Sequence, residues 1–256
     1  MEFHAAISST NSRASELARS YAAGLGSVES PLWRVVLTDD QTGGRGRLGR
    51  SWDVPPRASV AVSAIVPAPS ASEVGWVPLL TGVALARAIG AVTEAAGHRL
   101  EARLKWPNDV LLPADADRKV AGILCELVGL ADAKAAVVVG AGVNVDQARD
   151  ELPVGSATSL RLAGCEVARE DLVVRYLTEL VAVLQAPGGR AREEYRDRCA
   201  SLGADVRVEL PNGATTEGRA VRVDAGGALV VAVGGAEQAF SAGDVVHLRR
   251  GTPGLA

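Results

Sequence analysis

The hydrophobic pattern of the chain changes near Leu202, and this change constrains the possible folds more than any other feature. Before Leu202, helix-like segments are mixed with short apolar runs. After it, Val and Leu recur at every second position, and the turn-forming pairs Asn212-Gly213 and Gly226-Gly227 separate the runs. Alternation of this kind predicts short half-buried strands joined by hairpins. We therefore expect two domains, residues 1–202 and a small all-β barrel over residues 203–250.

The first 202 residues mix the two kinds of periodicity. Apolar positions three and four residues apart predict helices over residues 14–21, 77–96, 171–185 and 188–201. Short branched or apolar runs predict strands over residues 33–37, 59–66, 100–106, 110–112, 120–127 and 135–145. Asn11 or Ser12 is expected to cap the first helix. Because several strands follow one another without intervening helices, we expect an α+β fold rather than a strictly alternating one.

The overall composition excludes several classes of protein. Of 256 residues, 48% are hydrophobic, which argues against disorder, and the net charge of −3 argues against binding nucleic acid over the whole surface. Three widely spaced Cys and three scattered His residues predict neither a disulfide framework nor a protein metal site. No long uninterrupted apolar run or signal segment is present, so we expect a cytoplasmic protein that does not bind membranes.

A polar, glycine-rich stretch over residues 38–57 is too long for an ordinary connection, and such loops are usually functional. Residues 43–50 read GGRGRLGR, and Trp52 follows two positions later. Glycines let the backbone approach a ligand, and guanidinium groups match carboxylate and phosphate oxygens. Three arginines this close repel one another unless anions lie between them. The stretch therefore predicts a loop that becomes ordered around an anionic ligand, with a solvated turn as the alternative.

Four further segments carry candidate binding residues. They are Ser9-Thr10-Asn11, KWPNDV from Lys105, KVAGILCE from Lys119 and GAGVNV from Gly140. Lys is rare here, with 3 Lys against 24 Arg, so Lys105 and Lys119 point to sites that need a compact point charge. Each segment also has a structural alternative: a helix cap, a hairpin corner, an edge-guarding lysine and a tight turn, respectively.

Taken together and in this order, the five segments resemble the biotin protein ligases over residues 8 to 250, nearly the whole chain. The resemblance implies a ligase domain related to class II aminoacyl-tRNA synthetases, followed by an SH3-like barrel. It also implies a two-step reaction, in which ATP and biotin form biotinyl-5′-AMP. A specific lysine of a biotin carboxyl carrier domain then takes the biotinyl group. Mg²⁺ would accompany ATP.

The resemblance also assigns roles to individual residues. Biotin-binding residues would be Ser9, Thr10, Asn11, Gln41, Arg45, Gly46, Arg47, Lys119 and Gly122. Residues at the ATP or adenylate would be Arg50, Trp52, Lys105 and Asn144. Lys119 and Arg47 would be catalytic, because attack of one anion on another requires positive charge at the transition state.

Three other functions remain open from the sequence. A lipoate or octanoate ligase shares the chemistry, a non-catalytic biotin sensor shares the pocket, and an RNA-binding protein would use the arginine-rich loop. Ser9 lies so near the start of the sequence that we expect no DNA-binding domain before it and no repressor activity. The sequence does not indicate an oligomeric state.

Overall fold

A computed structural model describes residues 1–24, 30–130, 134–186 and 189–248 of the chain. Its centre is a seven-stranded sheet with the order β1-β2-β3-β7-β6-β5-β4. β1 and β2 are parallel, and the other neighbours are antiparallel. The strands are β1 (Glu2–His4), β2 (Val35–Thr38), β3 (Ser59–Pro67), β4 (Arg103–Lys105), β5 (Asp109–Leu112), β6 (Arg118–Gly129) and β7 (Ala135–Asn144).

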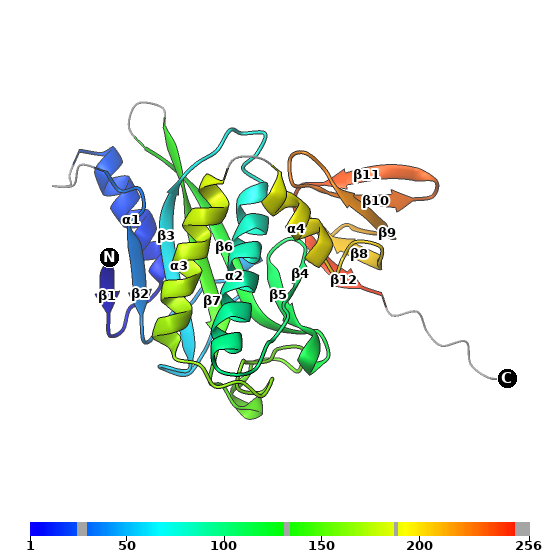
Figure 1. Cartoon of the computed structure of the whole chain (residues 1–256). Helices are drawn as coiled ribbons and strands as arrows, with labels where there is room; N and C mark the ends of the chain where they lie inside the picture. The colour runs from blue at the N-terminus through cyan, green and yellow to red at the C-terminus, as the bar shows by residue number, and fades with distance from the viewer. Residues whose placement is uncertain (25–29, 131–133, 187–188, 249–256) are drawn as a thin grey trace.

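Helices cover both faces of this sheet, which confirms the mixed α and β architecture expected from the sequence. The helices are α1 (Thr10–Ala22), α2 (Trp76–Ala95), α3 (Arg169–Gln185) and α4 (Arg190–Arg198), and short 3₁₀ turns occupy Arg47–Gly49, Pro113–Asp115 and Arg149–Glu151. Figure 1 shows α2 and α3 side by side in front of the sheet, with α4 beside the C-terminal part.

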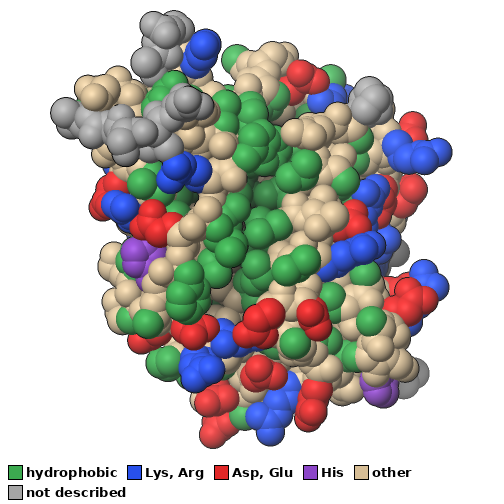
Figure 2. All heavy atoms as spheres, turned by 60° about the vertical axis from the view of Figure 1, so that its left-hand side comes forward, with side chains coloured by type: hydrophobic (Ala, Val, Ile, Leu, Met, Phe, Trp, Pro, Cys, Tyr) green, Lys and Arg blue, Asp and Glu red, His purple; other side chains and the backbone are tan. Residues whose placement is uncertain are grey.

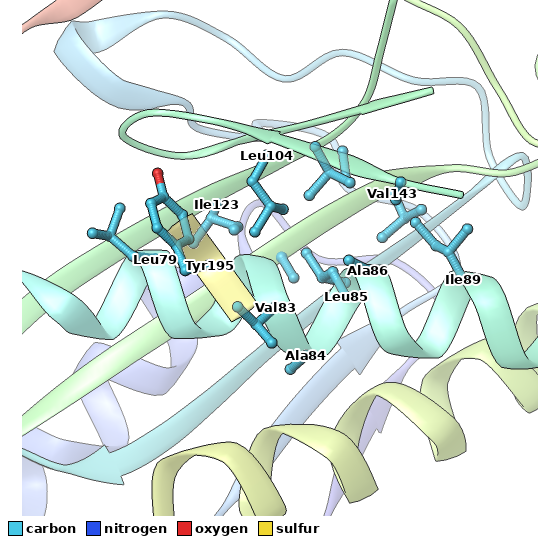
Figure 3. Packing of buried hydrophobic residues seen from close by; sticks show 14 of the residues in the cluster. Leu79, Val83, Ala84, Leu85, Ala86, Ile89, Leu104, Ile123, Val143 and Tyr195 are labelled. Atoms are coloured by element: carbon cyan, nitrogen blue, oxygen red, sulfur yellow. The ribbon is translucent and has the colours of Figure 1, made fainter. Parts of the chain in front are cut away.

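Helix α2 forms the centre of the larger hydrophobic core. Apolar side chains surround most of its circumference, as the sequence predicts, because the helix packs between α3 and the sheet. In Figure 3, Ala86 and Ile89 lie on the side of this helix that faces side chains from β4, β6, β7 and α4, whereas Val83 and Ala84 lie on its opposite side, toward α3. By length and composition α2 is apolar enough to cross a membrane, but two-thirds of its apolar window is buried inside the protein, as in the core helix of a soluble protein.

The other face of the sheet packs against α1 over only part of its area. Ile65, Val128 and Val138 form a second core with Ala14 and Ala18 of α1. Successive residues in a strand point to opposite faces, so residues two, four and six positions away from these share the same face. On β3 and β7 the neighbouring positions of this face carry the small residues Ala61, Ser63, Gly140 and Gly142, whereas β6 carries Gly122, Leu124 and Glu126 there.

The C-terminal part is a separate five-stranded antiparallel sheet with the order β11-β10-β9-β8-β12. Its strands are β8 (Asp205–Glu209), β9 (Thr215–Val223), β10 (Leu229–Val233), β11 (Ala236–Phe240) and β12 (Asp244–His247). The all-β nature that the sequence predicted for this part is confirmed, and its closure into a small barrel stays a prediction. Within the residues described, the edge strands β11 and β12 are not hydrogen-bonded to each other. Residues 249 and 250 of the predicted domain lie outside the described part.

Two tryptophans join the C-terminal sheet to the rest of the protein. The indole Nε1 of Trp76 donates to the carbonyl of Ala225 at 2.9 Å, and that of Trp106 donates to Gly227 at 3.0 Å. Both indoles are buried, and both acceptors lie in the turn between β9 and β10. Because two buried hydrogen bonds hold one turn, the C-terminal sheet has a fixed position against the start of α2 and the segment that follows β4.

The local predictions differ from the structure at a few element ends. Ser9, rather than Asn11 or Ser12, caps α1, and its hydroxyl accepts from the amide of Ser12. The strand expected over residues 33–37 is Val35–Thr38, because Trp33 has a positive φ that ends the extended backbone. β1 and β11 were not predicted, since both are short and too polar to show a clear period. The helix expected over residues 188–201 is nine residues long, and Gly188 lies outside the described residues.

The sheet edge formed by β1 and β2 lies on the left of Figure 1. Viewed from that side, the surface carries a band of hydrophobic side chains with charged side chains below it and along its flanks (Figure 2). Grey atoms cover the upper left of this view. The binding pocket described next is built on the sheet face that α1 covers.

Candidate functional site

A cavity of about 220 Å³ opens on the face of the sheet next to the N-terminus of α1. The backbone of β3, β6 and β7 forms its floor. Its walls are the first turn of α1 and residues 105–109, the turn between β4 and β5 that is here called the 105–109 corner. Residues 45–52 and β12 border it. The cavity therefore combines segments that are distant in sequence, and it includes residues of the C-terminal sheet.

Glycines on the floor leave room for other groups. A Cβ on Gly140 would lie 2.0 Å from Oδ1 of Asn11, and one on Gly142 would lie 2.6 Å from the Trp52 ring. A Cβ on Gly122 would come within 3.0 Å of the same ring. Real Cβ atoms do not make such contacts, so glycine is required for Asn11 and the indole to lie against the sheet.

Polar residues at the start of α1 form a buried network at one end of the cavity. The Ser63 hydroxyl, which has a single hydrogen, donates to Asn11 Oδ1 at 2.6 Å, and its oxygen lies 2.8 Å from Thr10 Oγ1. Gln41 Oε1 accepts from both the amide and the hydroxyl of Thr10. Ser9, Thr10 and Asn11 are all buried. A network of this kind fixes donors and acceptors before a ligand arrives, which suits a small polar ring system.

Lys119 of β6 lines the cavity. Its Nζ is 2.6 Å from Oδ1 of Asp109, the carboxylate at the 105–109 corner, and 5.5 Å from the centroid of the Trp52 ring. The strand β6 lies between β5 and β7, so Lys119 does not guard an edge. The Trp52 Nε1–H is buried and has no acceptor among the described residues. An ammonium group beside an aromatic face, with an unsatisfied donor nearby, provides a site for an anionic ligand that carries a planar group.

Residues 43–52, here called the arginine loop, are held at two ends. Arg45 Nη2 donates to Glu126 of β6 at 2.7 Å. Arg47 contacts Asn108 Oδ1 at 3.1 Å, Asp244 Oδ1 at 3.3 Å and the carbonyl of Gly243 at 3.1 Å. Arg50 pairs with Asp244. The loop predicted to order around an anion is thus anchored by carboxylates on both sides of the cavity.

Burial lowers the pKa of the Arg47 guanidinium, and the carboxylates of Asp244 and Asp109 oppose this by favouring the charged form. Arg47 remains charged at neutral pH, because an arginine pKa begins far above 7. Neighbouring Cys125 behaves differently. Burial raises the pKa of its thiol to about 12, which makes it a poor nucleophile.

The cavity brings together every predicted site residue except one. Its lining includes Ser9, Thr10, Asn11, Gln41, Arg45, Gly46, Arg47, Arg50, Trp52, Lys105, Lys119 and Gly122. Asn144 is not in this lining. It is buried, its Nδ2 donates to the carbonyl of Thr158 at 2.9 Å, and its Oδ1 accepts from Gln147. A contact between Asn144 and an adenylate stays a prediction.

Sequence reasoning missed three acidic residues of the site. Asp244 and Glu209 reach the cavity from the C-terminal sheet, and Glu126 lies just behind its wall. No local signal identifies them, because they come close to the cavity or to the arginine loop only through long-range folding. Glu126 belongs to the quoted KVAGILCE segment, but its position next to Arg45 depends on strand register.

The arrangement can bind a carboxylate or phosphate between cations while an apolar or planar portion rests on the glycine floor. Arg45, Arg47, Arg50, Lys105 and Lys119 all reach this one cavity. Within the described part of the chain, no cluster of three His, Cys, Asp or Glu side chains could hold a metal ion.

Comparison with known protein families gives matches to both parts of the chain. Residues 6–144 match the biotin/lipoate A/B protein ligase family, and residues 201–248 match the biotin protein ligase C-terminal domain. The first match covers more than half of the chain.

Individual relatives are similar to the chain over most of its length. The chain is 38% identical over 221 residues to the biotin–[acetyl-CoA-carboxylase] ligase of Mycobacterium tuberculosis, covering 84% of this chain and 79% of that protein. It is 30% identical over 240 residues to the bifunctional ligase/repressor BirA of Bacillus subtilis, covering 90% and 68% of the two chains.

Among solved structures, the biotin protein ligase of Aquifex aeolicus in complex with biotin and ATP superposes with a TM-score of 0.72. The superposition covers 97% of this chain and 98% of that one at 22% identity, which shows that the two proteins share a fold. The two family matches and the curated relatives, together with the five motifs that line one cavity, show that this chain belongs to the biotin protein ligases.

Proposed function

We propose that this enzyme attaches biotin to a specific lysine of a biotin carboxyl carrier domain, with biotinyl-5′-AMP as the intermediate. One observation carries the proposal: a single cavity joins the polar network of Thr10 and Gln41, the glycine floor and five cationic side chains. The neutral network suits the ureido ring of biotin. The cations suit its carboxylate and the phosphates of ATP.

In the first step, a carboxylate oxygen of biotin attacks the α-phosphorus of ATP, an O–P bond forms, and pyrophosphate leaves. Two anions must approach each other, so the barrier falls when fixed positive groups surround the reacting atoms. Lys119, which lines the cavity, is proposed to contact both the carboxylate and the α-phosphate. Arg47 and Arg50 border the cavity on the side of the C-terminal sheet and are the candidates for the departing pyrophosphate. Lys105 is proposed to contact the ATP phosphates from the 105–109 corner.

Mg²⁺ enters this scheme as the complex of ATP. Carboxylate oxygens are the ligands that Mg²⁺ prefers. Of the carboxylates in the cavity, Asp109 is paired with Lys119 and Asp244 with Arg47 and Arg50. Carboxylates that are already paired with cations suit a site that receives a metal ion bound to phosphates rather than one that holds a metal ion by itself. Glu209 is the third acidic residue in the lining of the cavity. When bound, the metal ion neutralises charge on the phosphates.

In the second step, the neutral amine of the carrier lysine attacks the carbonyl carbon of the mixed anhydride. An amide forms, AMP leaves, and the amine loses a proton to solvent or a nearby base. Before this transfer, the anhydride must be kept from water and from unrelated amines. The arginine loop is the segment placed to do this, with the Trp52 indole covering the anhydride or the adenine.

We also propose a relationship of each part of the chain to a known domain type. Residues 1–202 would be a catalytic domain related to class II aminoacyl-tRNA synthetases, and residues 203–250 an SH3-like domain that completes the cavity through β12. We further propose that the enzyme works in the cytoplasm, where its carrier substrate, a biotin-dependent carboxylase, would be found. No DNA, RNA or membrane partner is part of the proposal, and the absence of repressor activity stays a prediction.

The test is incubation of the protein with ATP, Mg²⁺, labelled biotin and a purified carrier domain, followed by detection of label on the carrier. We expect transfer to one lysine, and none when that lysine is replaced by arginine. A parallel reaction with lipoate on a lipoyl domain separates the related ligases. Label on the lipoyl domain alone would identify a lipoate ligase, and biotin binding without pyrophosphate release would identify a sensor.

A further inference from the structure

We propose that Glu126 is a positioning residue that joins the biotin end of the pocket to the arginine loop. This inference rests on the proposed function, because it concerns how the same cavity holds biotin. A single carboxylate oxygen, Oε2, accepts from Asn11 Nδ2 at 2.9 Å and from Arg45 Nη2 at 2.7 Å. Asn11 belongs to the pocket wall and Arg45 to the loop above it.

The strand register places Glu126 for this task. Gly122, Leu124, Glu126 and Val128 alternate onto the face of β6 that α1 covers. Gly122 and Leu124 line the cavity, and Val128 is part of the core beneath α1. Glu126 lies between these two environments, partly buried and outside the cavity lining. Its position is therefore suited to support ligand-contacting residues without contacting the ligand.

The hydrogen bonds of Asn11 show why this support matters. Its Nδ2 donates to Glu126 and to the carbonyl of Leu124, and its Oδ1 accepts from Ser63. An amide nitrogen has two hydrogens, so both donors of Asn11 are used. The amide can offer a ligand only the second lone pair of Oδ1. Glu126 thus fixes which atom of Asn11 faces the cavity.

Of the two hydrogen bonds to Glu126, the one from Arg45 is the weaker, and it is the one that can break when the loop moves. Arg45 is largely exposed, whereas Arg47 and Asp244 are more buried. Exposed ion pairs contribute little by themselves. However, the Glu126 oxygen is already held by Asn11, so Arg45 docks on a fixed acceptor. Closing of the loop near the biotin end and orientation of Asn11 are then coupled through one oxygen.

A carboxylate is required for this double role. An ionised carboxylate accepts hydrogen bonds at both oxygens and donates none. In Glu126→Gln the amide oxygen can still accept from Asn11, but the negative charge that attracts Arg45 is gone. The substitution is therefore expected to release the loop while it retains the shape of the wall.

The experiment uses Glu126→Gln, Arg45→Ala and the double variant that combines these two substitutions. Glu217→Gln serves as the control. Glu217 forms an exposed pair with Arg207 on the C-terminal sheet at 2.8 Å, does not line the cavity, and is the matched control. Hydrogen exchange of residues 43–52 is measured in the ligand-free proteins, so this readout does not depend on the identity of the ligand. Biotin and ATP affinities are then measured by calorimetry.

We expect faster exchange in the loop for Glu126→Gln and for Arg45→Ala, and no change for Glu217→Gln. Biotin affinity should fall about tenfold in each single variant, and the double variant should lose no more than one of them, because both act through one contact. ATP affinity should stay within about twofold. The carboxylate variant Glu126→Asp, with a shorter stem, should restore part of the affinity.

Two results would overturn the role of Glu126: unchanged exchange of the loop, or additive losses in the double variant. A parallel loss of biotin and ATP affinity together with a lower melting temperature would show a structural role only and would also overturn it. Absence of biotin binding by the unmodified protein would instead refute the proposed function. In that case the exchange experiment would still decide whether Glu126 holds the loop.

Discussion

The guanidinium of Arg47 lies 3.3 Å from the carboxylate of Asp244, a residue 197 positions later in the chain. This ion pair, together with the bond from Arg47 to the carbonyl of Gly243, connects the arginine loop to the first residue of β12. The C-terminal sheet is itself held by the buried indoles of Trp76 and Trp106. The loop therefore docks against a rigid neighbour rather than against solvent.

Replacing Asp244 with Asn should destabilise the protein and loosen the loop. Arg47 and Arg50 would lose their shared partner, and Arg47 is mostly buried. Breaking a fully buried pair costs about 3–5 kcal/mol, and partial exposure reduces this, so we expect about 1–2 kcal/mol in urea unfolding. The exposed control Glu217→Gln should cost less than about 0.5 kcal/mol. Equal costs in the two variants would contradict an anchoring role for Asp244.

Replacing Arg47 with Gly should release the activated intermediate. Without this side chain the loop loses its bonds to Asn108 and one of its two ion pairs with Asp244, so water and foreign amines can reach the mixed anhydride. We expect adenylation to be partly retained and biotin to appear on bystander proteins. Blotting of biotin on added albumin measures this effect. Labelling of albumin no higher than with the unmodified enzyme would argue against a retaining function of the loop.

Lys119→Ala should remove most adenylate formation and leave the fold intact. The ammonium group lines the cavity, and its loss removes the partner of the Asp109 carboxylate there. Removing one charge that stabilises a transition state typically lowers the rate about 10²–10³-fold. Pyrophosphate release measures the rate, and circular dichroism checks the fold. Release at the original rate would show that Lys119 is not a catalytic group.

Gly140→Ala should weaken biotin binding through Asn11. The added Cβ would lie 2.0 Å from Asn11 Oδ1, and Asn11 is held by Ser63, Leu124 and Glu126. Overpacking of this kind costs about 1–3 kcal/mol. Gly129→Ala on β6 is the matched control, because nothing lies within 4 Å of its added Cβ. We expect calorimetry to show at least a tenfold loss of biotin affinity for the first variant only. Equal affinities would mean that the close contact has no bearing on the ligand.

Stability should fall below about pH 6.5 because of His247. Burial lowers the pKa of this imidazole, and Lys105 and Arg103 lower it further, while Asp117 opposes them. Ser201 Oγ is 3.0 Å from Nε2. The unfolded chain therefore binds the proton more readily in this pH range, so the free energy of unfolding decreases as the pH falls from about 6.5 through the folded-state pKa.

Urea unfolding at pH 7.5 and 5.5 measures this dependence. His247→Gln, which cannot titrate, should lose less stability between the two pH values than the unmodified protein does. Identical losses in both proteins would exclude His247 as the source and leave the change to carboxylates.

Local patterns predicted the helices and most strands, because each depends on residues near in sequence. The circumference of α2 and the period-two alternation of β8 and β12 are examples. Short elements such as β1 were not predicted, since three residues do not establish a period. In addition, the pairing of β1 with β2 joins residues far apart in sequence.

The residue types of the site can be read from the amino-acid sequence. Closely spaced glycines, a few lysines among many arginines, and the Ser9–Asn11 segment are all visible without coordinates. The connections between these residues depend on the folded chain. Glu126 holds Arg45, and Asp244 holds Arg47, across 81 and 197 residues respectively. Periodicity records which face of an element is buried, but pairing between distant side chains depends on strand register and on packing between the two sheets, which no local pattern encodes.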